Sequence, residues 1–163
     1  MIKIIFCDDG LKLRNKKLIS AFNHVFKKQK MELLYLTIEH EDIVVYGIKD
    51  MEWIRINKKM EEVLANSYIL LDTLWSSDIA QVIKEKIINW CSKYNLYEKI
   101  FVYTRFSRDD ADLFIGDLER KKINVSNSSF IMIDDESYEQ FLHFALIFQA
   151  LQNDIERKND IYE

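Results

Sequence analysis

The sequence is poor in the residues from which glycine-rich nucleotide sites are built. It has no proline and only three glycines among 163 residues, Gly10, Gly47 and Gly116. A phosphate-binding loop of either common type needs several glycines at fixed spacing, because its backbone must approach the phosphates closely. The sequence therefore excludes both glycine-rich classes of nucleotide-binding protein.

Cysteine and histidine are also scarce. Cys7 and Cys91 lie within apolar runs and lack the spacing of metal ligands, so we expect buried, reduced thiols in a cytoplasmic protein. His24, His40 and His143 fall on three separate segments without ligand spacing. These patterns argue against a zinc site and against a Cys/His or Ser/His/Asp catalytic arrangement.

The chain also lacks long apolar runs and a large net charge. Its longest uncharged apolar stretch, residues 141–151, is about half the length that spans a bilayer. The N-terminal run meets two aspartates too early for a secretory signal. A formal net charge of −4 gives no electrostatic reason to expect a nucleic-acid partner. We therefore expect neither a membrane nor a nucleic acid as partner.

Short apolar runs that alternate with helical patterns are the main feature of the sequence. Strands are predicted at 2–7, 33–38, 68–71, 100–103 and 130–133, and helices at about 11–29, 58–65, 78–90, 107–120 and 137–151. The segment 43–56, within an insertion at about 42–57, alternates as a β-hairpin does. Apolar strands that are each followed by a helix are typical of a parallel sheet covered on both faces. We therefore predict an α/β three-layer, flavodoxin-like sandwich over residues 1–152, with a mostly parallel five-stranded sheet, an inserted hairpin and a frayed, charged tail at 153–163.

Polar residues follow several of the predicted strands. Right-handed crossovers bring the carboxyl ends of such strands to one edge of the sheet, where open α/β sheets bind ligands. The residues expected at this edge are Asp8, Asp9, Asp72, Thr104, Asp134 and Asp135. Aspartate is common after strands because it starts turns and caps helices. Carboxylates from three strands would nevertheless repel one another without a cation, and Mg²⁺ prefers such oxygen ligands.

Three motifs in order, IKIIFCDD with Arg14, YILLDTLW and IFVYTR, resemble the receiver domain of bacterial response regulators over residues 1–152. The resemblance implies that Asp72 is the phospho-acceptor and that Thr104 is the switch hydroxyl. It also implies that Asp8, Asp9, Asp72 and the backbone carbonyl of Leu74 bind Mg²⁺, which neutralises charge during phosphoryl transfer.

Three departures from the receiver pattern concern this chemistry. The run FIMIDDE has Ile133 or Asp134 where receivers carry a lysine, no proline follows Asp72, and the hairpin lengthens the interval between Asp9 and Asp72. Without the lysine, a phosphoryl group loses a charge-assisted contact. We therefore favour a degenerate, stand-alone receiver-like (pseudo-receiver) module that acts by binding protein.

Two other functions remain open from the sequence. A Mg²⁺-dependent hydrolase of a phosphoester or nucleotide would use Asp8, Asp9, Asp72 and Asp134 as ligands. A TIR-like nucleotide-sensing or NAD-cleaving domain shares the fold, although no glutamate suited to that chemistry is evident.

Two apolar surfaces are candidates for contact with a protein partner or a second copy. The last helix carries more apolar residues than one sheet can cover, among them Phe141, Phe144 and Phe148. The hairpin carries Trp53, which we expect to protrude into solvent.

Overall fold

The computed structural model describes residues 2–7, 16–40, 42–72, 85–86, 89–90, 93, 100–104, 130–132 and 140–162. The elements in chain order are β1 (Ile2–Cys7), α1 (Lys16–Val25), β2 (Met31–Glu39), β3 (Asp42–Lys49), β4 (Glu52–Ile56), α2 (Met60–Leu64), β5 (Ser67–Asp72), β6 (Ile100–Thr104), β7 (Phe130–Met132) and α5 (Gln140–Tyr162). Of the helix predicted at 78–90, the structure describes residues 85–86 and 89–90, all of them helical. The helix predicted at 107–120 lies outside the described residues.

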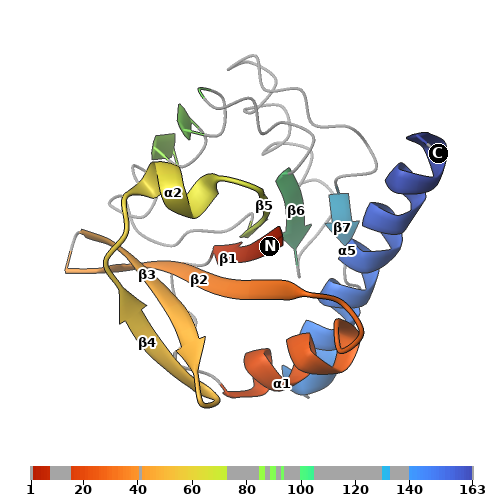
Figure 1. The fold of residues 1–163 in the computed structure, drawn as a ribbon, viewed down its shortest axis with the longest axis horizontal. Helices are drawn as coiled ribbons and strands as arrows, with labels where there is room; N and C mark the ends of the chain where they lie inside the picture. Colours follow the sequence, from red (N-terminus) through yellow and green to blue (C-terminus); the bar gives the residue numbers. More distant parts are fainter. Residues whose placement is uncertain are drawn as a thin grey trace.

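The described strands form one sheet of seven, in the order β4-β3-β2-β1-β5-β6-β7 (Figure 1). Parallel pairing joins β1 to β2 and β5, β5 to β6, and β6 to β7. Antiparallel pairing joins β2 to β3 and β3 to β4. The α/β class is confirmed, but the sheet is mixed, and the expectation of a mostly parallel five-stranded sheet is wrong. The cause is that β3 follows β2 through a short connection, which allows antiparallel pairing, so that the hairpin widens the sheet instead of standing apart.

A two-residue turn joins β3 to β4. Asp50 and Met51 have φ of 53° and 62°, and Lys49 lies opposite Glu52 in the register. Positive φ at both central residues is the geometry of a type I′ turn, which matches the twist of the flanking strands. The predicted hairpin is therefore present, as a regular one with Asp50 and Met51 at its turn.

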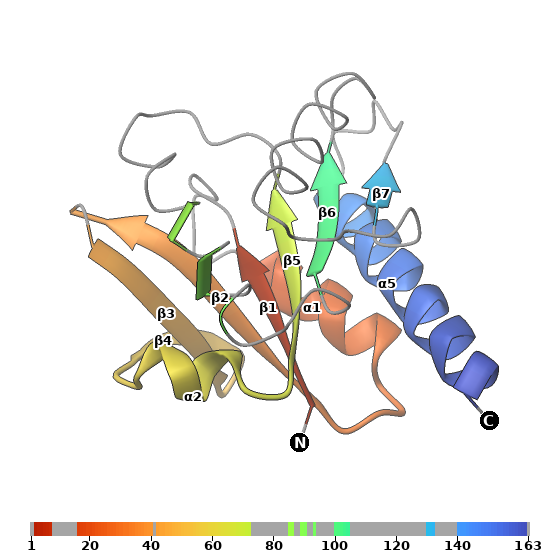
Figure 2. The same cartoon turned by 90° about the horizontal axis from the view of Figure 1, so that it is seen from above.

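Helices lie on both faces of the sheet. Figures 1 and 2 show α1 and α5 together on one face and α2 on the other. Strand residues that alternate between the two faces are buried on each, for example Ile4 and Phe6 toward α1 and α5 and Ile5 and Cys7 on the opposite side. Burial on both faces explains why the strands read as continuous apolar runs.

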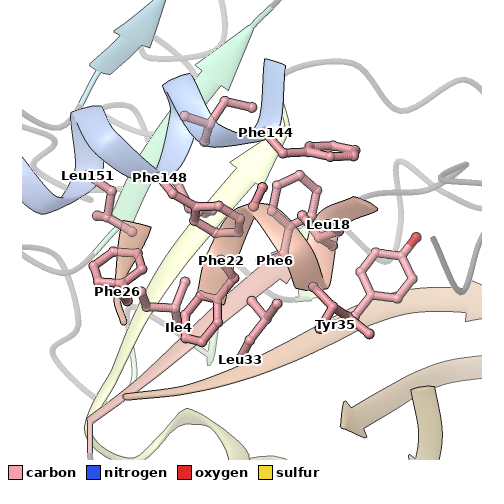
Figure 3. Packing of buried hydrophobic residues seen from close by; sticks show 14 of the residues in the cluster. Ile4, Phe6, Leu18, Phe22, Phe26, Leu33, Tyr35, Phe144, Phe148 and Leu151 are labelled. Carbon is pink, nitrogen blue, oxygen red and sulfur yellow. The ribbon is translucent and has the colours of Figure 1, made fainter. Parts of the chain in front are cut away.

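Aromatic side chains dominate the core between the sheet and the helices α1 and α5 (Figure 3). The Phe6 and Phe144 rings meet edge to face with centroids 5.9 Å apart, and those of Phe22 and Phe148 do so at 5.6 Å. Edge-to-face contacts add to the hydrophobic gain from burial. On α1, Leu18 and Phe22 lie four residues apart and are both buried, so one face of this helix is turned toward the core.

The expectation that the segment from residue 153 frays is wrong. The helix α5 continues to Tyr162, and Asp154 and Ile155 within it are buried. Leu151 and Ile155 continue at helical spacing the apolar stripe that begins with Phe144 and Phe148, so this segment packs on the core despite its charges.

Candidate functional site

The carboxyl ends of β1, β5 and β6 lie level with one another. In the parallel register, Cys7 pairs with Leu71 and Asp72 pairs with Tyr103. Asp72, the last residue of β5, is thus one position beyond the pairing partner of Cys7, and Thr104 is one position beyond Tyr103. Figure 2 shows these three strands and β7 pointing to the same side of the sheet. One sheet edge therefore carries both Asp72 and Thr104.

The strand order reverses at this edge. From β1 the chain adds β2 on one side and later adds β5, β6 and β7 on the other. In an open α/β sheet, the crevice at such a reversal, beyond the carboxyl ends of the strands, is where ligands bind. The reversal between β1 and β5 thus lies beside Asp72.

The structure brings together some of the predicted site residues. It confirms that the strand leading to Asp8 and Asp9 and the strand ending in Asp72 are parallel neighbours. Thr104 ends the next strand, as predicted. Asp8, Asp9, Leu74, Asp134 and Asp135 lie outside the described residues.

The part of the sheet next to this edge is buried. Cys7 and its β2 neighbour Leu36 are fully buried, and Thr37, one residue further along β2, is also buried. Cys7 is not part of a disulfide, as the sequence predicted, whereas Cys91 lies outside the described residues. Charges near such a surface interact more strongly than they do in water. Thr37 was not among the residues predicted for this edge, although its hydroxyl within the run LLYLTI was the available signal.

Two side chains with shifted pKa values lie at the opposite edge, near the amino ends of β1 and β5. Burial lowers the pKa of Lys3, with Lys58 acting in the same direction and Glu32 and Glu62 opposing. The Lys3 Nζ atom donates a hydrogen bond of 2.6 Å to the backbone carbonyl of Glu62, which ties α2 to β1.

Burial also raises the pKa of Tyr68, whose neighbour across the β1–β5 pair is Ile4. Lys3 and Tyr68 lie at the end of the strands remote from Asp72, so their shifts reflect packing at the amino edge.

No group of three or more His, Cys, Asp or Glu side chains that suits a metal ion occurs within the described ranges. Because Asp8, Asp9 and Leu74 fall outside those ranges, the Mg²⁺ site stays a prediction. In the described part of the chain, no helix combines the length and the apolar character needed to cross a membrane.

The predicted contact residues need correction. Phe144 and Phe148 are fully buried and point toward Phe6 and Phe22 (Figure 3), so they belong to the core. Phe141 is partly buried, and its ring meets that of His24 edge to face at 5.9 Å.

Trp53 is only 8% exposed because strand alternation turns it toward the α1 face, where its ring lies 5.8 Å from that of Tyr35. The expectation of a protruding tryptophan is therefore wrong. Among the α5 residues whose side chains the structure describes, Leu142 and Leu146 are the exposed large apolar ones, at 45% and 42%.

In comparisons with known proteins, no protein-family model and no curated protein matches the chain.

Proposed function

We propose that the chain is a receiver-like regulatory module of the degenerate kind, which acts by binding another protein. The observation that supports this most strongly is the common end point of β1, β5 and β6 at the reversal of strand order, with Asp72 and Thr104 as the last residues of their strands. These are the positions at which the resemblance to receiver domains requires an acceptor carboxylate and a hydroxyl.

In this proposal Asp72 is the residue that reacts with a small phosphodonor. A carboxylate oxygen of Asp72 attacks the phosphorus atom, and the bond from phosphorus to the donor's leaving oxygen breaks. The Thr104 hydroxyl donates a hydrogen bond to a phosphoryl oxygen. Carboxylates from Asp8, Asp9 and Asp72 with the Leu74 carbonyl form a ligand set that suits Mg²⁺, which supplies charge neutralisation when bound.

The proposed phosphorylation switch is weak because the sequence has no lysine directly after β7. The run after β7 offers Ile133 and Asp134 where a lysine would contact the phosphoryl group. A neighbouring carboxylate repels a phosphoryl group, and a lysine there would contribute a charge-assisted contact. Phosphorylation is therefore inefficient in the natural chain, and the regulatory effect depends on binding a protein partner. We assign this binding to the exposed side of α5 around Leu142 and Leu146.

The decisive experiment introduces the lysine that receiver domains carry at this position. The chain and its Asp134→Lys variant are incubated with Mg²⁺ and acetyl phosphate, and the phosphorylated fraction is measured by intact mass spectrometry. We expect D134K to raise that fraction about tenfold, since a hydrogen bond to a charged group contributes on the order of 1.5–3 kcal/mol.

Two controls make this result specific. Adding Asp72→Asn to D134K must abolish the label, and a label that persists contradicts the assignment of Asp72. An unchanged fraction in D134K contradicts the receiver-like geometry. A metal-dependent turnover of a generic phosphodiester that Asp9→Asn removes would support the hydrolase instead.

A further inference from the structure

The strand β4 is the outermost of the described strands at its side of the sheet and pairs there only with β3 (Figure 1). An outermost strand directs half of its backbone N–H and C=O groups away from the sheet and is a template for a further strand.

The turn geometry identifies the outward groups. Lys49 and Glu52 close a two-residue hairpin and therefore exchange backbone hydrogen bonds. Hydrogen-bonded and non-hydrogen-bonded pairs then alternate along the antiparallel ladder. It follows that Ile54 directs its backbone groups toward β3, whereas Trp53 and Arg55 direct theirs outward.

The side chain between these two outward positions lacks cover. Ile54 is 41% exposed, and the residue opposite it on β3 is Gly47, which has no side chain to lie against it. A Cβ atom at Gly47 would come within 3.3 Å of Cγ2 of Ile56, so the neighbouring residue of this face already fills that space. An apolar side chain thus remains open to solvent at the centre of a five-residue edge strand.

We propose that β4 pairs in antiparallel fashion with β4 of a second copy of the chain, about a twofold axis at Ile54. Outward groups must face outward groups, so Trp53 lies opposite Arg55 of the second copy and Arg55 opposite its Trp53. Each pair places the exposed Arg55 of one copy next to the largely buried Trp53 of the other. The two Ile54 side chains meet at the axis and cover one another.

Neighbouring registers are less favourable. Moving the axis to Arg55 places the two Arg55 side chains opposite each other, and like charges that face each other destabilise a pair. Moving it to Trp53 places Ile54 opposite Glu52 and leaves the apolar side chain without an apolar neighbour. The strand is therefore its own complement in one register, which is why we assign the edge to a second copy. The contact is short, so the dimer dissociates readily on dilution.

Sedimentation analysis over a range of protein concentrations tests the proposal. We expect reversible, concentration-dependent dimers of the natural chain. Ile54→Lys brings two ammonium groups together at the axis and should raise the dissociation constant by at least about tenfold. Ile2→Lys makes the same change at a similarly exposed residue of β1 and should leave that constant unchanged. A monomer at every concentration, or dimers lost in I2K and kept in I54K, would overturn the proposal.

A cysteine at the axis tests the register itself. Residues that face each other in a non-hydrogen-bonded pair have Cβ atoms about 5 Å apart, close enough for a disulfide after a small adjustment. Under mild oxidation Ile54→Cys should form a covalent dimer, whereas Ile2→Cys, at a similarly exposed position of β1, and the natural chain should not. Equal cross-linking of I54C and I2C would show random collision and refute the register.

Discussion

Cys7 of β1 lies opposite Leu71 of β5 in a parallel pair, and this one register sets the geometry of the candidate site. It makes the two strands end at the same edge, one before the Asp8-Asp9 sequence and the other at Asp72. Since Cys7 is fully buried, the Asp8-Asp9 sequence follows directly on a buried part of the sheet.

Neutralising one carboxylate of the edge should change thermal stability in opposite ways with and without a cation. In the presence of a chelator, Asp9→Asn should raise Tm, because it removes repulsion among neighbouring carboxylates. In millimolar Mg²⁺ the natural chain should gain more Tm than D9N, because a bound ion stabilises only the folded state. Differential scanning fluorimetry measures both, and equal Mg²⁺ responses would contradict a shared ion site.

Truncating Phe148 should be costly, because its ring packs against those of Phe6, Phe22 and Phe26 in the core. We expect Phe148→Ala to lower the free energy of unfolding by about 3–5 kcal/mol in urea denaturation. The matched change Leu146→Ala, on the exposed side of the same helix, should cost less than about 0.5 kcal/mol. Similar losses in the two variants would show that α5 does not face the core as described.

The last part of α5 should contribute to stability as well. Ile155 is buried next to the stripe that includes Leu151, so Ile155→Ala should cost about 2 kcal/mol or more. Glu156→Ala, at the adjacent exposed position, is the control and should have little effect. If I155A unfolds at the same urea concentration as the natural chain, the segment after Gln152 behaves as the frayed tail that the sequence suggested.

The lowered pKa of Lys3 should make the free energy of unfolding increase as the pH becomes alkaline. Burial lowers the pKa of Lys3 below 10.5, so in this window the unfolded chain binds more protons than the folded one, and the free energy of unfolding increases as pH rises toward 10.5. Lys3→Met should remove this rise.

Tyr68 acts in the opposite sense, because its raised pKa makes the folded state lose stability as pH rises above 10.0. Tyr68→Phe should remove only that loss. Urea denaturation of both variants at a series of pH values separates the two effects, and a K3M profile equal to that of the natural chain would refute the first assignment.

The parts of the fold that depend on local patterns were predictable from the sequence. The spacing of Leu18 and Phe22 identifies the inward face of α1, and the apolar runs that end at Cys7 and Asp72 identify two neighbouring strands. Asp72 and Thr104 were placed correctly at strand ends because a strand stops where its apolar run stops.

The parts that depend on tertiary contacts were not predictable. A hairpin pattern does not reveal whether its first strand finds a free edge, so the pairing of β3 with β2 appears only in the structure. The burial of Trp53 depends on that pairing, since it turns one face of β4 toward α1. In the tail, Ile155 lies among charged residues, and the core neighbours that keep it helical are distant in the chain.

The most direct test of the central claim is a crystal structure of the chain grown with Mn²⁺ in place of Mg²⁺, in which anomalous scattering locates the ion. We predict one ion at the carboxyl edge, with carboxylate oxygens of both Asp9 and Asp72 at metal-ligand distances, about 2.1 Å for Mg²⁺ itself. A structure in which these two side chains point to opposite rims of the sheet, with no shared ion, would contradict both the metal site and the receiver-like function.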